Sequence, residues 1–310
     1  MADRRILEIL MATYNGAAFI REQIDSILAQ TDDGWHLTVS DDGSDDGTKD
    51  ILDGYAREYP EKIARIESGT RFGNARDHFF YLTGACEAEW MMLCDQDDTW
   101  APDKTGKFRL AMDRAEEAYG AETPLLIFSD QAVTDGALNP MAPSLMRWQK
   151  QYTGEFDYRS ILMQNVVTGG AMALNRPLAE LAGECADRTR VCMHDWWTAA
   201  AAARFGRIIY LDEPLGTYRQ HGANAVGAKH VGSAAYSRDR LGKLDEVRES
   251  IRKKKAQAAV FRNTYARRLT GEDIDFLDGF AKERSGASFW MKYGKLIHGQ
   301  ERKAGMILLG

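Results

Sequence analysis

The chain has 310 residues, of which 44% are hydrophobic and 28% charged, a balance typical of soluble globular proteins and not of disordered ones. Its net charge of -6 argues against binding nucleic acid over its whole surface. No run reaches the roughly 18 apolar residues of a transmembrane helix, and MADRRILEILMATYN lacks signal-peptide features, so we expect a cytoplasmic protein. The four cysteines form no CxxC pair and are expected to be reduced and mostly buried: Cys86, Cys94, Cys185 and Cys192.

Short apolar runs alternate with helical patterns along the first 130 residues. Runs at 6–11, 37–40, 63–67, 90–94 and 125–129 predict β-strands, because turn residues or acids bound each of them. Between the first two runs, Ile20, Ile24, Ile27 and Leu28 fall on one face of a helix. This alternation predicts an α/β fold with a mainly parallel sheet and flanking helices, in which ligands bind at the carboxyl ends of the strands.

Three of the predicted strands end in polar clusters. The first runs into ATYNG (residues 12–16), the second into SDDGSDDGT (40–48) and the fourth into DQDD (95–98). Each cluster taken alone can be a turn or a helix cap. Because a turn needs only one or two polar residues, we expect the three clusters to converge on one crevice.

The third cluster brings Asp95, Asp97 and Asp98 close together after an apolar run. In an extended segment Asp95 and Asp97 project to the same side. Hard cations such as Mg²⁺ and Mn²⁺ bind one or two protein carboxylates together with substrate phosphates. The spacing therefore suits a divalent metal bridged to a nucleotide diphosphate, although the pattern Asp-x-Asp is also common by chance.

The chain resembles the glycosyltransferase family 2 enzymes of the GT-A fold over roughly residues 5–227. The resemblance rests on MATYNG, SDDGSDDGT, LCDQDDTWAPDK, TGGAMALNR, HDWW and YRQHGAN, which occur in the family's order. It implies a GT-A (Rossmann-like) fold, a nucleotide-sugar donor, a divalent metal (Mn²⁺ or Mg²⁺) and inversion of the anomeric configuration. The implied acceptor is a hydroxyl of a glycan or of a lipid-linked saccharide.

The resemblance assigns the nucleotide to the first two clusters and the loop at residues 71–76. Tyr14 would stack on the base, Asp42 would hydrogen-bond it, and Thr13 would line the pocket. Arg76 is a candidate contact to the diphosphate or the base.

The resemblance assigns the metal and the diphosphate to the third cluster and to YRQHGAN. Asp97 would ligate the metal directly, and Asp95 would contact the ribose or a metal-bound water. Arg219 or His221 would reach the diphosphate or its metal. Asp98 has two interpretations, a contact to the donor sugar or a cap on the turn before Trp100.

The segment HDWW carries the candidate catalytic base, Asp195, which would deprotonate the acceptor hydroxyl. The alternative is that Asp195 caps a helix over 196–204. One of Trp196 and Trp197 would form a platform for a sugar ring, and the other would lie in the core. Gly169 and Gly170 offer a backbone that a sugar can approach closely.

The composition changes after about residue 230, and we expect a GT-A catalytic domain over 1–230 and a basic, amphipathic helical region over 231–310. Residues 238–268 hold eleven Lys or Arg against four acids, with Leu241, Leu244, Val247 and Ile251 at helical spacing. Three interpretations stay open: peripheral contact with an anionic membrane surface near a lipid-linked acceptor, a helical appendage packed on the catalytic domain, and homo-oligomerisation.

The donor sugar depends on finer likeness. LCDQDDTWAPDK and HDWW are most similar to bacterial rhamnosyltransferases of cell-surface polysaccharide synthesis, which implies dTDP-L-rhamnose. A UDP-hexose or UDP-N-acetylhexosamine remains open, as does a nucleotide-sugar-binding protein without catalysis. A nucleotidyltransferase is disfavoured because TYNG lacks a glycine-rich phosphate loop.

Overall fold

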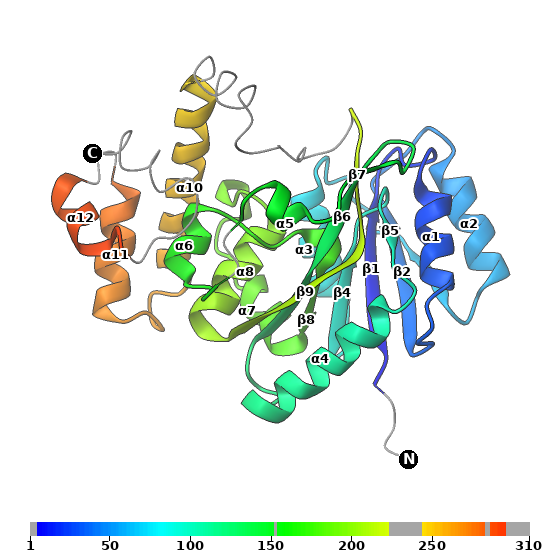
Figure 1. Cartoon of the computed structure of the whole chain (residues 1–310), viewed down its shortest axis with the longest axis horizontal. Helices are drawn as coiled ribbons and strands as arrows, with labels where there is room; N and C mark the ends of the chain where they lie inside the picture. Colours follow the sequence, from blue (N-terminus) through cyan, green and yellow to red (C-terminus); the bar gives the residue numbers. More distant parts are fainter. Residues whose placement is uncertain (1–4, 152–153, 223–243, 283–285, 296–310) are drawn as a thin grey trace.

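One mixed sheet forms the centre of the molecule (Figure 1). The computed structural model describes residues 5–151, 154–222, 244–282 and 286–295. Within them the strand order is β3-β2-β1-β4-β8-β6-β9-β5, with β7 beside β6. The strands are β1 (Leu7–Thr13), β2 (Trp35–Asp41), β3 (Ile63–Ile66), β4 (Trp90–Cys94), β5 (Thr99–Trp100), β6 (Leu125–Asp135), β7 (Pro140–Ala142), β8 (Met172–Asn175) and β9 (Arg207–Gln220).

The half of the sheet from β3 to β4 is parallel, as predicted. Thr13 pairs with Asp41 and Met11 with Cys94, so the carboxyl ends of β1, β2 and β4 meet at one edge. Beyond β4 the sheet is mixed, because β8 is antiparallel to both β4 and β6 while β9 is parallel to β6. The α/β class is confirmed, and the all-parallel half of the sheet is the one whose strands carry the three polar clusters.

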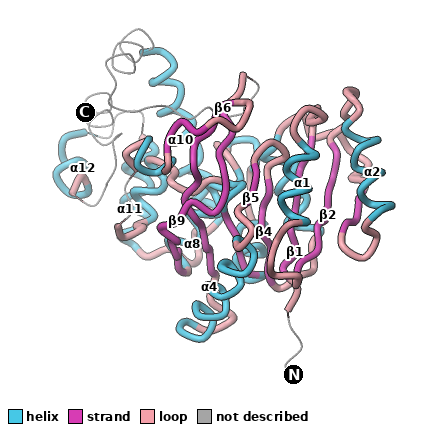
Figure 2. The backbone as a smooth tube through the Cα atoms, turned by 45° about the vertical axis from the view of Figure 1, so that its right-hand side comes forward, coloured by secondary structure: helices cyan, strands magenta, loops and turns pink. Residues whose placement is uncertain are grey.

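Helices cover both faces of the sheet (Figure 2). Their bounds are α1 (Ile20–Leu28), α2 (Thr48–Glu58), α3 (Ala75–Ala85), α4 (Lys104–Tyr119), α5 (Leu145–Trp148), α6 (Tyr158–Met163), α7 (Arg176–Gly183), α8 (His194–Phe205), α10 (Leu244–Thr264), α11 (Gly271–Ala281) and α12 (Gly286–Tyr293), with 3-10 turns η1 (Gly169–Ala171) and η2 (Arg188–Arg190). Alternate residues of β4 enter two cores: Trp90 and Met92 pack with α1 and α4, and Met91 and Leu93 pack with α3 and α8.

The C-terminal helices α10, α11 and α12 lie together at one end of the molecule (Figure 1). Their apolar side chains, including Phe261 and Phe276, belong to the same core cluster as Trp197 of α8, as does Tyr265 directly after α10. The described part of the predicted helical region is therefore packed against the sheet domain. The predicted boundary near residue 230, and Leu241, lie outside the described residues. None of the described helices is long and apolar enough to cross a bilayer.

The junction between α8 and β9 packs closely against the residue before β6. A Cβ on Gly206 would lie 1.8 Å from the carbonyl oxygen of Pro124, so the backbone would have to move. We expect Gly206→Ala to lower the free energy of unfolding by roughly 2 kcal/mol or more. Gly183→Ala is the matched control, because a Cβ there meets nothing within 4 Å. Urea titrations that give the two variants equal stability would contradict this account.

Candidate active site

A cavity of about 710 Å³ opens where β1, β2 and β4 end. Its lining includes Thr13, Tyr14, Asp42, Arg71, Asp95, Asp97, Asp98, Gly169, Asp195 and Trp196. Residues from all three polar clusters therefore share one cavity, as the sequence predicts. The segment at residues 164–169 and the first residues of α8 also line the cavity.

Tyr14 presents its ring at the mouth of this cavity, with 46% of the residue exposed. Its backbone is held by Gln96, whose side-chain amide accepts from the Tyr14 N–H and donates to the Tyr14 carbonyl, both at 2.9 Å. The Arg71 guanidinium lies 5.1 Å from the ring centroid and donates to the Tyr14 hydroxyl at 2.8 Å. The buried Thr13 hydroxyl donates to Asp41 at 2.9 Å, which ties β1 to β2.

Asp42 joins the end of β2 to the loop that carries Arg71. Its N–H donates to the Thr13 carbonyl, and its carboxylate accepts from the N–H groups of Phe72 and Gly73. The residue is buried but lines the cavity. Because each carboxylate oxygen can accept two hydrogen bonds, these contacts leave acceptor capacity for a ligand.

Arg76 does not line the cavity, contrary to the sequence expectation. Its guanidinium forms two 2.9 Å hydrogen bonds with the adjacent Asp77 and donates to the Val191 carbonyl at 3.0 Å. A carboxylate matches the planar guanidinium fork, and Asp77 occupies it here. Arg71 is the arginine of this loop that reaches the cavity, and the sequence analysis missed it.

The acid cluster after β4 is partly buried, and this changes its protonation. Burial and the nearby Asp98 carboxylate raise the pKa of Asp95 well above its usual range. Burial and the charge of Asp97 raise the pKa of Asp98 to about 7. The cluster is therefore costly to ionise completely without a nearby positive charge.

Asp98 connects this cluster to the far half of the sheet. One carboxylate oxygen accepts from the Arg219 N–H of β9 at 2.9 Å, and the other accepts from the Gln131 side chain of β6 at 3.0 Å. The cap interpretation of Asp98 is therefore wrong, because its carboxylate bonds two distant strands. A contact between Asp98 and a donor sugar stays a prediction.

Lys104 is a buried cation behind the acid cluster that the sequence analysis missed. It has no exposed surface, donates to the Gly170 carbonyl at 2.9 Å and lies 4.1 Å from the centroid of the Trp100 ring. Burial lowers its pKa to about 8, and its positive charge lowers the pKa of Asp98. The available signal was its place at the first residue of α4, where the helix dipole disfavours a cation.

His221 reaches the acid cluster and the Arg219 side chain does not. The His221 Nε2 atom lies 2.8 Å from an Asp97 carboxylate oxygen, and its ring stacks on Phe19 with centroids 4.5 Å apart. The Arg219 guanidinium is directed to Glu22 of α1 and is buried against Phe19. The prediction of a diphosphate contact therefore does not fit the Arg219 side chain, and only its backbone N–H serves the cluster.

Among the described residues, no group of three or more His, Cys, Asp or Glu side chains is arranged to hold a metal ion by itself. The carboxylates of Asp95 and Asp97 nevertheless face the same cavity, with His221 beside Asp97. This donor set suits a cation that completes its coordination with substrate phosphates and water.

Asp195 lies in the first turn of α8 and lines the cavity. Met193 occupies the N-cap position, so Asp195 is not the capping residue. The Asp195 carboxylate accepts from the N–H of Gly169 at 3.2 Å. Burial nevertheless raises the pKa of Asp195 to about 7, which suits a group that exchanges protons near neutrality.

The two tryptophans of HDWW separate as the sequence predicts, one at the cavity and one in the core. Trp196 lines the cavity, and its indole N–H donates to the Ile161 carbonyl. Trp197 has no exposed surface, donates to the Ala182 carbonyl at 3.0 Å and packs against Tyr265. Trp197 is therefore excluded as a sugar contact.

A row of glutamine amides also lines the cavity, and it was not predicted from the sequence. The Gln164 side chain donates to Gln151 at 2.7 Å, and Gln151 donates to Gln149 at 3.0 Å. These residues line the cavity together with Lys254 of α10. They follow no regular pattern in the sequence, so only the fold brings them together.

The buried lysine generates a stability prediction. Lys104→Met leaves Asp95 and Asp98 without their buried counter-charge, and we expect it to lower the free energy of unfolding by roughly 3 kcal/mol at pH 7, where Lys104, with a pKa of about 8, is mostly protonated. The deficit should shrink at pH 5, below the raised pKa of Asp98, because protonated carboxyls need no counter-charge.

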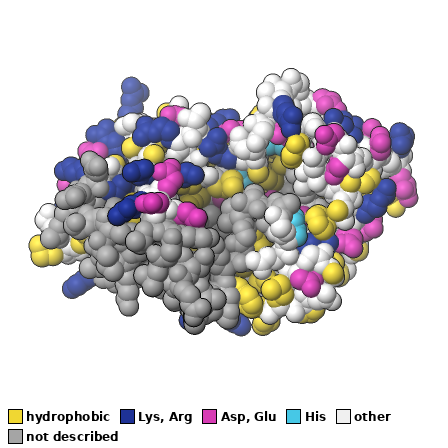
Figure 3. All heavy atoms as spheres, turned by 90° about the horizontal axis from the view of Figure 1, so that it is seen from above, with side chains coloured by type: hydrophobic (Ala, Val, Ile, Leu, Met, Phe, Trp, Pro, Cys, Tyr) yellow, Lys and Arg dark blue, Asp and Glu magenta, His cyan; other side chains and the backbone are white. Residues whose placement is uncertain are grey.

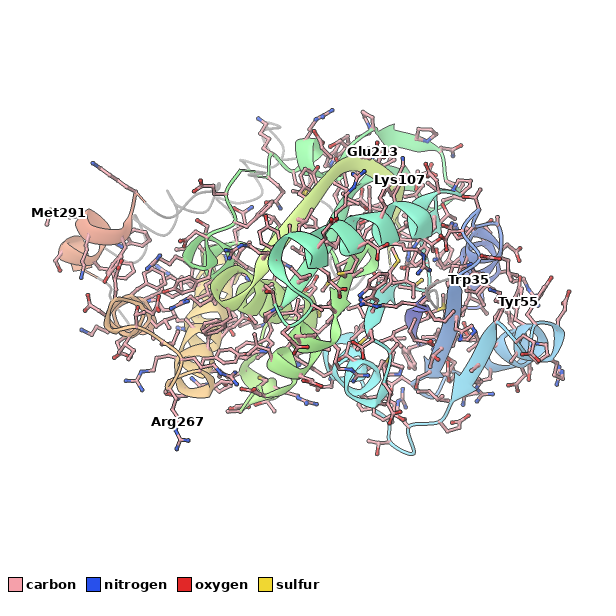
Figure 4. The ribbon with its side chains drawn as sticks, turned by 90° about the horizontal axis from the view of Figure 1, so that it is seen from below. Trp35, Tyr55, Lys107, Glu213, Arg267 and Met291 are labelled. Atoms are coloured by element: carbon pink, nitrogen blue, oxygen red, sulfur yellow. The ribbon has the colours of Figure 1, made fainter. Side chains whose placement is uncertain are left out.

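The control is Lys107→Met on the same helix, where the exposed lysine pairs with Glu213 of β9 (Figure 4). That change should alter the free energy of unfolding by about 0.5 kcal/mol or less. Equal effects of the two substitutions at both pH values would exclude the counter-charge role of Lys104.

Comparison with known proteins identifies the family. Residues 8–176 match the family model described as glycosyl transferase family 2. The dTDP-rhamnosyl transferase RfbG of Shigella flexneri is 28% identical over 260 residues, which cover 78% of this chain and 82% of RfbG. The fold is similar to that of S. aureus TarS (residues 1–349) in complex with UDP-GlcNAc, with a TM-score of 0.57, 16% identity and coverage of 97% of this chain and 75% of TarS.

It is also similar to the mannosyltransferase PcManGT from Pyrobaculum calidifontis in complex with GDP-Man and Mn²⁺, with a TM-score of 0.51, 17% identity and coverage of 99% of this chain and 79% of that one. These likenesses confirm the GT-A fold. Because the family model matches more than half of the chain, the protein belongs to glycosyl transferase family 2 and is a glycosyltransferase.

Proposed function

We propose that the protein transfers L-rhamnose from dTDP-L-rhamnose to a hydroxyl of a glycan or lipid-linked saccharide, with inversion, in cell-surface polysaccharide synthesis. One observation carries the reaction class: a single cavity joins the ring of Tyr14, the carboxylates of Asp95 and Asp97, and the half-buried Asp195. The donor sugar is supported by the likeness to RfbG, which is named a dTDP-rhamnosyl transferase.

The donor nucleotide would bind at the Tyr14 end of the cavity. An aromatic face at the mouth offers a stacking surface for a base, and Asp42 beside it offers a hydrogen-bond acceptor. The Arg71 guanidinium, which already covers one face of Tyr14, supplies a positive charge at the same end. This arrangement directs the diphosphate toward the acid cluster.

We propose that Asp97 and Asp95 hold a divalent cation, Mn²⁺ or Mg²⁺, together with the donor phosphates, with His221 beside Asp97. The proposal is supported by the strained electrostatics of the cluster, since a positive charge would relieve the cost of ionising Asp95. Such a cation neutralises the negative charge that develops on a departing nucleoside diphosphate.

Asp195 would act as the general base. Its ionised carboxylate accepts the proton of the acceptor hydroxyl as that oxygen forms a bond to the anomeric carbon. The bond from the anomeric carbon to the diphosphate oxygen breaks, and the nucleoside diphosphate leaves with the bonding electrons. A single displacement of this kind inverts the anomeric configuration and needs no covalent intermediate.

The acceptor would enter beside Trp196 and the amide row. An aromatic side chain and several amides are suited to a neutral saccharide, which offers both apolar ring faces and hydroxyls. A lipid-linked acceptor would bring the chain to a membrane surface. Exposed cations on α10, at the end of the molecule where Lys and Arg gather in Figure 3, would favour an anionic surface: Arg248, Arg252 and Lys253.

The base assignment has a kinetic test. Asp195→Asn should lower kcat by roughly 100-fold or more and leave donor binding intact. In the native protein kcat/KM should fall about tenfold per pH unit below pH 7, because protonation of a base whose pKa is about 7 removes its function. Asp113→Asn, an exposed change on α4, is the matched control. Native turnover in Asp195→Asn would refute the assignment.

One assay tests both the donor and the metal. It compares the rates of transfer and of donor hydrolysis for dTDP-L-rhamnose, UDP-glucose, UDP-GlcNAc and GDP-mannose. We expect fastest transfer or donor hydrolysis with dTDP-L-rhamnose and Mn²⁺, and loss of activity with EDTA or Asp97→Asn. A preference for a UDP-sugar would replace the rhamnose proposal. Binding without turnover of any donor would favour a nucleotide-sugar-binding protein. Activity that EDTA leaves unchanged would refute the proposed metal dependence.

A further inference from the structure

His194, the first residue of α8, has an imidazole ring that no step above uses. The ring lines the cavity beside Asp195, and the residue is only 6% exposed. It stacks on Phe79 with ring centroids 4.3 Å apart and an interplanar angle of 27°. Neither ring nitrogen forms a hydrogen bond with any residue that the structure describes.

Packing alone does not account for an imidazole at this position. Buried polar groups in proteins are nearly always hydrogen-bonded, and an unpaired one is costly. An apolar ring would stack on Phe79 without that cost. Burial lowers the pKa of His194 to about 3, so the ring is neutral near pH 7 and carries one hydrogen-bond donor and one acceptor. The unmet hydrogen-bonding capacity therefore points to a ligand.

The position of the ring indicates which ligand. The Nε2 atom faces Gly169, where an added Cβ would lie 2.9 Å away. Gly169 donates its N–H to Asp195, and a Cβ on the next residue, Gly170, would lie 2.7 Å from an Asp95 carboxylate oxygen. The imidazole, the proposed base and the acid cluster thus border the same two glycines.

A donor sugar must occupy this region, because its anomeric carbon lies between the diphosphate and the attacking oxygen. We propose that His194 is a sugar-recognition residue, whose imidazole hydrogen-bonds a hydroxyl of the donor sugar. Stacking on Phe79 holds the ring in place, and the absence of a side chain at Gly169 admits it. This inference rests on the proposed function for the placement of the diphosphate and the base.

The test compares the binding of sugar nucleotides with that of the matching nucleoside diphosphates by calorimetry. For His194→Ala, we expect affinity for dTDP-L-rhamnose to fall about tenfold while affinity for dTDP is unchanged. Native protein should lose a similar factor with the monodeoxy analogue that lacks the contacted hydroxyl, and His194→Ala should lose nothing further with it. His194→Gln, which keeps a donor and an acceptor, should recover part of the affinity.

His194→Phe guards against a trivial folding defect, because it preserves the stacking surface and removes the unpaired nitrogens. This variant should melt at or above the native temperature and still lose discrimination between the sugar and its deoxy analogues. His36→Ala, a change at an exposed histidine, is the control for histidine loss in general. Folded His194 variants that discriminate as native protein does would overturn the inference, as would a loss confined to the KM for the acceptor.

Different outcomes test the proposed function and the role of His194. If native protein binds and discriminates the sugar but transfers it to no acceptor and does not hydrolyse it, the proposed catalysis is refuted and the role of His194 stands. If UDP-sugars bind instead of dTDP-L-rhamnose, the same comparison is made with UDP-glucose, UDP and the corresponding deoxy donors.

Discussion

Mutual repulsion among the carboxylates after β4, in a site that is largely withdrawn from water, constrains the rest of the cavity. Asp98 is buried and Asp95 half-buried, both near Asp97, so each negative charge raises the cost of ionising the next carboxyl. The fold offsets this cost from within through Lys104, and through hydrogen bonds from Gln131 and the Arg219 backbone to Asp98. A site held in this way favours any ligand that arrives with positive charge.

The mixed half of the sheet follows from the same constraint. The parallel strands β1, β2 and β4 bring the three polar clusters to one edge, but they supply few groups to hold Asp98. β6 and β9 run beyond that edge, and their side chains and backbone reach the cluster from the other side. The glycines of η1 lie close to the start of α8 and to the acid cluster, because Gly169 borders His194 and Gly170 borders Asp95. The nucleotide end and the reacting end are thus built from different halves of the sheet.

The strands and the α/β class were predictable, because the spacing of apolar residues and the turn residues are local signals. The meeting of the polar clusters was predictable, because parallel strands end at one edge of the sheet. The hydrogen-bond partners of the arginine side chains could not be predicted. Arg76 bonds the adjacent Asp77 and the Val191 carbonyl, and Arg219 bonds Glu22 of α1, and the Val191 and Glu22 contacts depend on tertiary packing. Lys104 gave a weak signal at a helix N-terminus. The amide row from Gln149 to Gln164 gave none, because residues without a regular period meet only through tertiary packing.

The packing of α10 against α8 links two properties that are often regarded as separable. Trp197 and Phe261 lie in one core, so the helix that presents Asp195 is braced by the C-terminal region. The same α10 places Ser250 and Lys254 on the cavity wall. Substitutions on α10 that alter which acceptor the cavity binds therefore also affect the packing that stabilises the enzyme. Divergence of acceptor preference within such a chain would be expected to proceed through coupled substitutions on α8 and α10, and an exchange of the C-terminal helices alone would carry a penalty in folding.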